Sequence, residues 1–464
     1  MKILLAASEI VPFAKTGGLA DVAGALPLAL EDLGHEVIVA VPKYKVIQSF
    51  KGQEQIKKTK SGIPYYIIGS NIKVYFIEND QYFNRDGLYG DKAGDFADNL
   101  DRFSYYCDAA LKLLKEIKFK PDIVHVHDWQ ASLIPVYLKT RYANDDFYKG
   151  IKTILTIHNI GYQGLFAREE FSKLGLDWSL FNIEGFEFYG KINILKAGME
   201  FCDYINTVSP TYSKEIQTEE FGFGLEGVLN KRRDCVFGIL NGLDYSIWNS
   251  RDDKFIVKNY SLEDIQNKYK NKEDLQAFCK LPVKMDIPVF GIVSRLAEQK
   301  GFDILAEAID TICKMGLQLV ILGTGDQKYH KILEDIVKKY PKVISLHLKF
   351  DDSLAHKIYA GSDIFLMPSK YEPCGLGQLI SLKYGTIPLV FKTGGLADTV
   401  NNDNGFIFDR YSSDELVKTM KTAIAAFKDK KKWRALVVAA MKCNYSWEGS
   451  AKKYVQLYEK AKAK

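Results

Sequence analysis

The sequence of 464 residues lacks several features that would assign it quickly to a class of protein. It has only seven cysteines, odd in number and scattered, and no Cys-x-x-Cys spacing. This argues against a disulfide framework or a structural zinc site and favours a reducing compartment. No apolar run could span a bilayer, and the run at Met1–Ala7 stops at Ser8-Glu9, too early for a signal peptide. The net charge of +5 is small for this length and does not indicate a general nucleic-acid binder. We therefore expect a cytoplasmic protein with neither a membrane nor a nucleic acid as partner, and the sequence leaves its oligomeric state open.

Two phosphate-handling motifs are also missing. The chain contains no Asp-x-Asp, a carboxylate pair that holds a metal ion on a diphosphate, and no Walker-type lysine motif for ATP. If this protein handles a diphosphate, fixed cations must do the work of the metal ion.

The chain does contain one heptapeptide twice, Lys-Thr-Gly-Gly-Leu-Ala-Asp at Lys15–Asp21 and again at Lys392–Asp398. Chance explains this repeat with odds on the order of 10⁻⁴. Adjacent glycines let backbone N–H groups approach an anion, and the lysine adds positive charge. For one copy alone, an ordinary strand-to-helix turn is an equally good interpretation. Two copies favour a similar loop in each half of the protein and a cleft shared by two domains.

Short apolar, β-branched segments alternate with helical patterns over most of the chain. Continuous apolar runs bounded by turns are typical of strands covered by helices on both faces. The length also exceeds one ordinary core. We therefore predict an α/β protein with two doubly wound, Rossmann-like domains facing a central cleft. The expected strands are Lys2–Ala7, Glu36–Val41, Val74–Ile77, Ile123–His127, Thr153–Ile157, Tyr204–Val208, Val289–Ser294, Gln318–Leu322, Val343–Leu346, Ile364–Pro368, Pro388–Phe391 and Gly405–Phe408.

The domain boundary is predicted at Asn241-Gly242-Leu243-Asp244, before a polar stretch with few strand signals. This gives an N-terminal domain of residues 1–243, a C-terminal domain of residues 244–445, and a final helix over residues 446–464. The helix has an apolar face and must pack on a neighbour, so we expect it to bridge back to the N-terminal domain. The residues on that face are Trp447, Tyr454, Leu457 and Tyr458.

Polar clusters follow many of the predicted strands. Ligands of open α/β sheets bind beyond the carboxyl ends of the strands, so clusters that face one crevice indicate an active site. The clusters are Lys15–Asp21, His125–Trp129, His158-Asn159, Ser294-Arg295, Pro368–Gly377 and Lys392–Asp398.

Three of these clusters each allow two interpretations. Arg295 and Lys300 could clamp a diphosphate leaving group, or they could lie in a solvated loop with an ion pair to Glu298. In the Glu372–Gly377 segment, the acidic residue could contact sugar hydroxyls or a developing cation, or it could pair with a helix dipole. For Cys374 we favour a packed thiol over a nucleophile.

The third cluster contains His125, His127, Asp128 and His158. The alternation of His125 and His127 points both to one face of a strand, but no further ligand has a characteristic metal spacing. We favour Asp128 and His158 as hydrogen-bonding groups for a polyhydroxylated substrate over a metal site.

Together these motifs resemble those of bacterial glycogen synthases and plant starch synthases. The matching motifs are Lys15–Leu19, His127–Gln130, Ile157–Gly164, Asn241–Asp244, Ser294–Gly301 and Glu372–Leu376, and the resemblance covers essentially the whole chain. It implies a GT-B architecture and transfer of glucose from ADP-glucose to the non-reducing end of an α-1,4-glucan, with retention of configuration and without a metal ion or other cofactor. The N-terminal domain would then face the acceptor, and the C-terminal domain would bind the nucleotide sugar.

The resemblance also implies roles for individual residues. Arg295 and Lys300 would clamp the donor diphosphate, Glu372 would be the leading catalytic carboxylate, and Asp128 and His158 would line the glucose and acceptor side. The carbonyl of His158 would stabilise the oxocarbenium-like centre, and Phe350 would stack on adenine. The residues expected to bind substrate are Lys15, Gly17, Gly18, Asp21, Asn159, Asn241, Phe350, Cys374, Gly375, Leu376 and Gly377.

Two positions depart from the family pattern. Gly377 stands where the family often has Thr or Ser, so a hydroxyl contact to phosphate would be lost. Ile380 occupies the second position of the E-x₇-E pattern of sister families, so a double displacement through that position fails. The alternatives left open are a retaining transferase with a UDP-sugar donor, a silent glucan- or nucleotide-binding protein, and a dehydrogenase.

Overall fold

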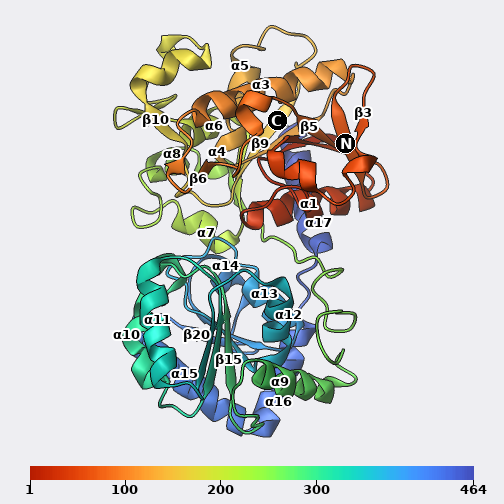
Figure 1. Ribbon diagram of the computed structural model, residues 1–464. Coiled ribbons are helices and arrows are strands. Elements are labelled where there is room, and N and C mark those ends of the chain that lie inside the picture. The colour runs from red at the N-terminus through yellow and green to blue at the C-terminus, as the bar shows by residue number, and fades with distance from the viewer. Residues whose placement is uncertain (464) are drawn as a thin grey trace. The chain divides into compact units, whose positions relative to one another are not determined.

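The computed structural model describes residues 1–463, which divide into two compact units. Unit 1 comprises residues 1–242 with the described residues 447–463, and unit 2 comprises Leu243–Ser446 (Figure 1). The chain therefore crosses between the units at Gly242-Leu243 and again at Ser446-Trp447. Each unit is described by itself below.

Within the described residues, unit 1 is built on a sheet of nine strands in the order β14-β13-β9-β8-β1-β2-β5-β4-β3. The strands from β14 to β5 are parallel, and β4 and β3 add an antiparallel edge. The strands predicted for this half are confirmed to within one or two residues. Three strands toward the two ends of this sheet, β3, β4 and β14, were not predicted. The bounds are β1 Lys2–Ala6, β2 Glu36–Pro42, β3 Lys57–Lys58, β4 Pro64–Ile68, β5 Ile72–Ile77, β8 Ile123–His127, β9 Lys152–Ile157, β13 Tyr204–Thr207 and β14 Val236–Gly238.

Helices cover this sheet, and two small antiparallel ladders project from it. The helices are α1 Gly18–Asp32, α2 Asp80–Phe83, α3 Asn99–Glu116, α4 Asp128–Ala131, α5 Leu133–Lys139, α6 Ile194–Phe201, α7 Pro210–Glu215, α8 Glu226–Lys231 and α17 Trp447–Ala463. The ladders pair β6 Gly90–Asp91 with β7 Gly94–Asp95, and β10 Leu165–Ala167 and β11 Glu187–Phe188 with β12 Lys191–Asn193.

The terminal helix α17 packs against α1 in unit 1 (Figure 1). The four residues predicted to form its apolar face are all buried in the unit 1 core, which confirms that expectation. Two of them also make polar contacts. The hydroxyl of Tyr458 lies 2.8 Å from Nδ1 of His125, and the hydroxyl of Tyr454 accepts a hydrogen bond of 3.2 Å from Nδ2 of Asn206. The helix thus completes the core and satisfies buried polar groups of the sheet.

Among the described residues of unit 2, six parallel strands lie in the order β17-β16-β15-β18-β19-β20, and all six were predicted. They are β15 Val289–Val293, β16 Gln318–Leu322, β17 Ile344–His347, β18 Ile364–Met367, β19 Ile387–Phe391 and β20 Phe406–Phe408. The helices are α9 Lys268–Phe278, α10 Phe302–Ile312, α11 Gln327–Lys339, α12 Asp352–Gly361, α13 Gly377–Lys383, α14 Gly394–Thr399, α15 Ser413–Lys428 and α16 Lys430–Lys442.

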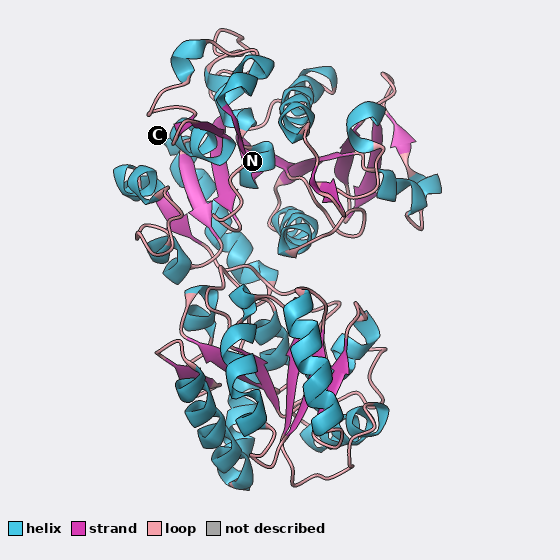
Figure 2. Ribbon diagram, turned by 60° about the vertical axis from the view of Figure 1, so that its left-hand side comes forward, coloured by secondary structure: helices cyan, strands magenta, loops and turns pink. Residues whose placement is uncertain are grey.

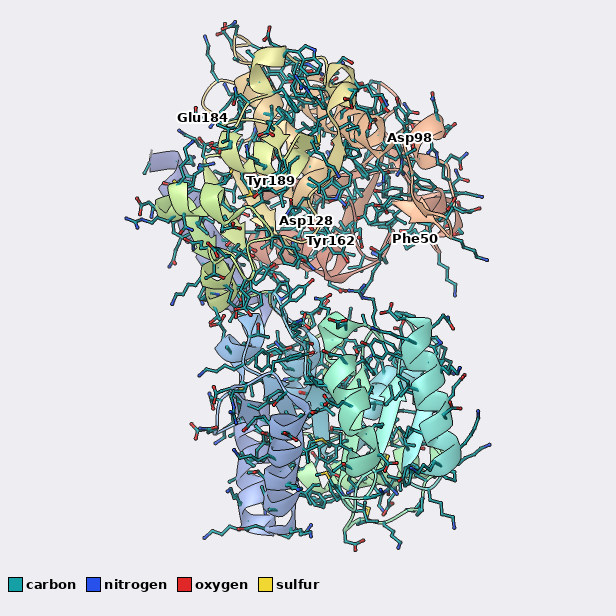
Figure 3. All side chains as sticks on the ribbon, turned by 90° about the vertical axis from the view of Figure 1, so that its left-hand side faces the viewer. Phe50, Asp98, Asp128, Tyr162, Glu184 and Tyr189 are labelled. Atoms are coloured by element: carbon teal, nitrogen blue, oxygen red, sulfur yellow. The ribbon has the colours of Figure 1, made fainter. Side chains whose placement is uncertain are left out.

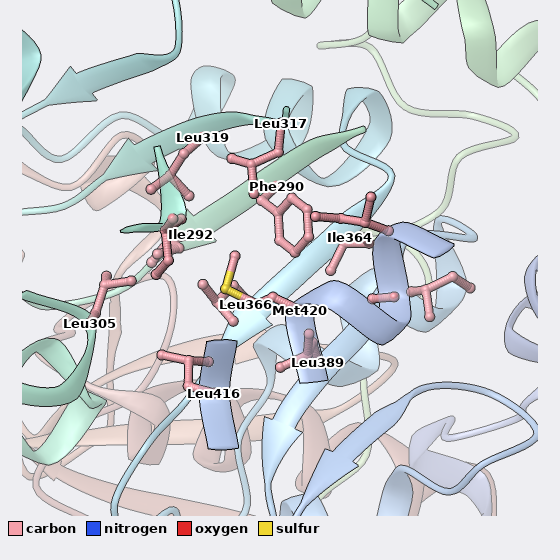
Figure 4. Packing of buried hydrophobic residues seen from close by; sticks show 14 of the residues in the cluster. Phe290, Ile292, Leu305, Leu317, Leu319, Ile364, Leu366, Leu389, Leu416 and Met420 are labelled. Atoms are coloured by element: carbon pink, nitrogen blue, oxygen red, sulfur yellow. The ribbon is translucent and has the colours of Figure 1, made fainter. Parts of the chain in front are cut away.

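Neighbouring residues of the central strands enter different cores, which shows that helices cover both faces of this sheet (Figure 2). Phe290 and Leu319 belong to one core with Met420 of α15, as Figure 4 shows, whereas Val289 and Val320 belong to the other. This explains why the strands are continuous apolar runs without alternation. Among residues 1–463, no helix combines the length and the apolar character needed to cross a membrane.

Candidate active site

In unit 1, the first copy of the heptapeptide forms the turn from β1 into α1. The carboxylate of Glu9 accepts hydrogen bonds from the backbone N–H of Thr16 at 2.5 Å, from its hydroxyl at 2.5 Å and from the N–H of Gly17 at 3.0 Å. The backbone N–H groups of this loop therefore do bind an anion, but that anion is the internal carboxylate of Glu9. A Cβ built on Gly18 would meet no described atom within 4 Å, so the backbone there is open to a ligand.

Sequence reasoning missed Glu9, which is 4% exposed and lies beneath this loop. The hydroxyl of Tyr89 donates to the same carboxylate at 2.7 Å and lies 2.7 Å from the hydroxyl of Ser8. The only signal in the sequence was an acidic residue directly after an apolar strand. Lys15 extends from the loop and forms an exposed ion pair of 2.7 Å with Asp21, so these two predicted residues lie together.

Asp128 and His158 come from the ends of neighbouring strands, β8 and β9, and they are in contact. Asp128 has a left-handed backbone with φ of 55°, and its Oδ1 accepts a 2.7 Å hydrogen bond from the N–H of His158. Burial raises the pKa of Asp128 to about 7, and the nearby Glu9 adds to the rise, while the N–H groups of His158 and Asn159 oppose it. A strained carboxylate with a pKa near neutrality is typical of a functional site.

The imidazole of His158 is neutral, because burial lowers its pKa to about 3. Its Nε2 lies 2.9 Å from Nδ1 of His127, whose pKa burial also lowers well below the usual value. Nε2 of His127 is buried and has no hydrogen-bond partner among residues 1–463. Buried donors without an acceptor are rarer than buried acceptors without a donor, so we assign the proton of His127 to Nδ1. His158 then accepts at Nε2 and carries its own proton on Nδ1.

Two predicted asparagines differ in their surroundings. Oδ1 of Asn159 accepts a 3.0 Å hydrogen bond from the N–H of Gly161, so its side chain holds the loop that follows β9. Asn241 is 6% exposed, and its buried Oδ1 has no hydrogen-bond partner within the described part of the chain. An orphaned acceptor of this kind is an available group for a ligand donor.

In unit 2, Lys300 and Glu372 form a partly buried ion pair, in which Glu372 is buried and Lys300 is partly exposed. Nζ of Lys300 lies 2.6 Å from Oε2 of Glu372, which also accepts a 3.1 Å hydrogen bond from the hydroxyl of Ser369. The loop that carries Lys300 and the loop that carries Glu372 are joined through their backbones. The N–H of Lys370 donates to the carbonyl of Gln299 at 2.9 Å, and a Cβ on Gly301 would lie 2.1 Å from the carbonyl oxygen of Pro368.

The pair lines a cavity of about 160 Å³ at the carboxyl ends of β15 and β18. Six residues that were predicted for the site line it together with apolar side chains of the sheet and its helices. Those predicted residues are Ser294, Lys300, Glu372, Gly375, Leu376 and Gly377.

The second copy of the heptapeptide, Lys392–Asp398, packs against the loop that carries Glu372. The N–H of Gly395 donates to the carbonyl of Glu372 at 3.1 Å. A Cβ on Gly394 would lie 2.0 Å from the same carbonyl oxygen, and one on Gly395 would lie 2.2 Å from that of Cys374. Lys392 forms an exposed ion pair of 3.1 Å with Asp409. Here the glycines allow backbone to pack on backbone.

Gly375 and Gly377 each fill a position with little room for a side chain. Gly375 has φ of 74°, and a Cβ there would lie 2.4 Å from Oε1 of Gln378. A Cβ on Gly377 would lie 2.8 Å from Cε1 of Phe365 and 3.3 Å from the hydroxyl of Tyr359. A Thr or Ser in place of Gly377 would require the Phe365 ring to shift. Cys374, between the two glycines and Glu372, is buried, as expected for a packed thiol.

Arg295 and Phe350 are exposed. Nη2 of Arg295 lies 3.4 Å from Oε1 of Gln299. Glu298, the partner in the alternative ion pair, instead lies 3.8 Å and 3.9 Å from Nζ of Lys328 and Lys370. Phe350 is 84% exposed just beyond β17 and is available to stack on a planar ligand. Among residues 1–463, no group of three or more His, Cys, Asp or Glu side chains could hold a metal ion.

Comparisons with known proteins identify the family of the chain. Residues 2–231 match the family model described as the starch synthase catalytic domain, and residues 275–435 match glycosyl transferases group 1. The chain is 48% identical over 483 residues to a glycogen synthase from Geotalea uraniireducens, covering 100% of this chain and 99% of the relative. It is also 48% identical over 485 residues to one from Thermosipho africanus, covering 99% of each.

Among solved structures, the catalytic domain of starch synthase IV from Arabidopsis thaliana, described as bound to ADP and acarbose, matches with a TM-score of 0.89 and 32% identity. The match covers 100% of this chain and 99% of that one. A sucrose-phosphate synthase from Thermosynechococcus elongatus, 18% identical with a TM-score of 0.63, shares the fold.

Two doubly wound units with polar loops at the carboxyl ends of their strands define a glycosyltransferase of GT-B architecture. Within that class, the full-length identity places the chain more narrowly. It belongs to the glycogen and starch synthase family and is a glucosyltransferase.

Proposed function

We propose that this enzyme transfers glucose from ADP-glucose to the non-reducing end of an α-1,4-glucan such as glycogen, with retention of configuration. The observation that carries the proposal is the partly buried Lys300–Glu372 pair, which lines a cavity at the carboxyl end of the unit 2 sheet in a chain of this family. The starch synthase structure with ADP supports ADP-glucose as the donor.

The donor diphosphate is assigned to fixed cations. Lys300 lies on the cavity, and Arg295 is exposed nearby in sequence and able to turn toward a ligand. Because both charges are present before the reaction, they stabilise the negative charge that develops on the leaving diphosphate. Lys15 and Gly18, with Gly17 and Asp21 holding the loop, are proposed as a further phosphate contact. Phe350 is proposed to stack on adenine.

Glucose is assigned to Glu372, Asp128, His158, Asn159 and Asn241. Glu372 accepts hydrogen bonds, so its carboxylate is suited to sugar hydroxyls and to a positively charged transition state. His158 offers its Nδ1–H as a donor, and its carbonyl is proposed to stabilise the oxocarbenium-like centre. The leaving phosphate oxygen would take the proton of the acceptor 4-hydroxyl on the same face of the sugar, which retains the configuration.

The same assignment gives each unit a role. We propose that residues 1–243 with the helix 446–464 bind the acceptor, and that residues 244–445, including Cys374, Gly375, Leu376 and Gly377, bind the nucleotide sugar. We also propose that the protein works in the cytoplasm.

Nucleotide release from ADP-glucose and from UDP-glucose, each with glycogen, tests this function. We expect kcat/KM to be at least about ten-fold higher with ADP-glucose, equivalent to about 1.4 kcal/mol. A preference for UDP-glucose would overturn the donor assignment. Absence of transfer from either donor would overturn the activity.

A further inference from the structure

Two turns of unit 1 hold aromatic residues in a backbone conformation that rarely accepts them. Tyr189 and Gly190 are the two residues between β11 and β12, in which Phe188 pairs with Lys191. Their φ angles are 48° and 78°. Two-residue hairpins with positive φ at both positions strongly favour Asn-Gly or Asp-Gly, because a Cβ strains the left-handed region. Tyrosine is therefore an unfavourable choice at the first position.

The second turn repeats this choice. Phe223 and Gly224 have φ angles of 53° and 83°. Non-glycine residues with positive φ are uncommon, and bulky ones are outliers that cluster at functional sites. The chain thus places an aromatic residue before a glycine in two separate left-handed turns.

The two turns lie against each other. A Cβ built on Gly224 would lie 2.9 Å from Cζ of Phe188 and 3.4 Å from Cε2 of Tyr189. The rings of Phe188 and Tyr189 are 4.7 Å apart between centroids. The second turn therefore packs at Gly224 against the aromatic residues of the first, although the two turns are more than thirty residues apart in the sequence.

This feature is continuous with the candidate site. The carbonyl of Phe223 accepts a 3.0 Å hydrogen bond from Nε2 of Gln163, and the Phe223 ring lies 3.7 Å from a Cβ built on Gly161. Gly161 is in turn held by Asn159, the residue after His158. Tyr162 belongs to the same loop and is 57% exposed. Tyr162 and Tyr189 are labelled with Asp128 in Figure 3.

Packing does not explain these side chains. Tyr189 is 82% exposed and Phe223 is 45% exposed, so most of the Tyr189 ring adds nothing to the core. Exposed aromatic groups gathered beside a site mark a binding surface. The C–H faces of glucose rings are apolar and their edges carry hydroxyls, so an α-1,4-glucan combines a surface for aromatic stacking with groups that bind the polar atoms of the site.

We propose that Tyr189, Phe223 and Tyr162, the aromatic platform, bind the acceptor glucan by stacking on glucose units that lie beyond the reacting end of the chain. The proposal rests on the proposed function, since it names where that reaction holds its acceptor. The platform contributes to the binding of long acceptors and not to the binding of short ones.

Asparagine tolerates the left-handed region, so Tyr189→Asn and Phe223→Asn remove the rings while keeping the turns. With saturating ADP-glucose, we expect each substitution to raise KM for maltoheptaose and glycogen by about ten-fold. KM for maltotriose, KM for ADP-glucose and kcat should stay within about two-fold. Tyr189→Phe, which keeps the ring, should restore the wild-type KM.

Thermal unfolding separates this role from a structural one. Because asparagine relieves strain, the platform predicts an unchanged or higher Tm together with weaker glucan binding. Tyr269→Ala, which removes an aromatic ring that is 47% exposed on α9 of unit 2, serves as the control and should change none of these values.

Retardation of each variant in a native gel containing glycogen tests the platform without catalysis. If the wild type is retarded but transfers no glucose, the proposed function fails and the platform stands. The platform would be overturned if Tyr189→Asn and Phe223→Asn were retarded as strongly as the wild type and, as active enzymes, kept an unchanged KM for maltoheptaose. A lower Tm with equal losses for all acceptors would also overturn it, in favour of a structural role.

Discussion

The first copy of the repeated heptapeptide, Lys15–Asp21, and the second, Lys392–Asp398, share seven residues but differ in what their glycines face. In the first copy, Cβ atoms built on Gly17 and Gly18 would meet no described atom within 4 Å. In the second, those built on Gly394 and Gly395 would lie 2.0 Å and 2.2 Å from backbone carbonyl oxygens. The first loop is open at its surface, and the second is closed by the Glu372–Cys374 backbone.

The difference shows that the same heptapeptide can have two structural roles, one in an open loop and one in a loop packed against another. Gly18 in the first copy has open space around its Cβ position, while Thr16 and Gly17 hold the internal carboxylate of Glu9. Glycine in the second copy lets one loop pack on another and so sets the position of Glu372. The comparison predicts that the two copies respond in opposite ways to the same substitution.

Gly395→Ala should have the largest effect among substitutions within the repeat. The added methyl group would lie 2.2 Å from the carbonyl oxygen of Cys374, so the loop must move. Overpacking of this kind costs about 1–3 kcal/mol of stability. Displacement of Glu372 by about 1 Å should lower kcat by roughly 10². Thermal unfolding and steady-state kinetics on the same preparation measure both effects.

Gly18→Ala is the matched control for stability. The methyl group has open space and lies at the start of α1, where alanine favours the helix, so the free energy of unfolding should stay constant or rise by up to about 1 kcal/mol. Equal destabilisation by Gly18→Ala and Gly395→Ala would remove the distinction between an open and a closed loop.

The two lysines of the repeat should differ in their effect on catalysis but not on stability. Lys15 and Lys392 both form exposed ion pairs, which contribute little to stability, so neither Lys15→Ala nor Lys392→Ala should change Tm. If Lys15 contacts the donor diphosphate, kcat/KM for ADP-glucose should fall by about 10² in Lys15→Ala. It should stay within about two-fold in Lys392→Ala. The reverse result would show that the roles of the two loops were exchanged.

Much of the fold could be predicted because it depends on local patterns. Buried strands such as Val289–Val293 and Ile364–Met367 are apolar runs, and the apolar face of the terminal helix is visible in its spacing. Strands such as Val236–Gly238 escaped notice because three residues carry no clear periodicity. They become strands through pairing with a neighbour that lies far away in the sequence.

The site was predictable in its residue types but not in its contacts. Lys300 was expected at the donor diphosphate and Glu372 at the donor sugar, and the structure joins the two side chains directly at 2.6 Å. Glu9 was missed because its partners Thr16 and Tyr89 come together only in the folded chain. The crowding of Gly377 by Phe365 was also invisible, since it depends on the packing of α13 on β18.

The glucose-transfer activity of the Glu372→Gln enzyme tests the central claim most directly. That claim is that the cavity with the Lys300–Glu372 pair is the catalytic site of a glucan synthase. Glucose incorporation into glycogen from ADP-glucose would be measured beside ADP binding by calorimetry, with thermal unfolding to confirm the fold. The account predicts that transfer falls by at least roughly 10² while ADP binding is retained. Unchanged turnover in a folded Glu372→Gln enzyme would contradict it.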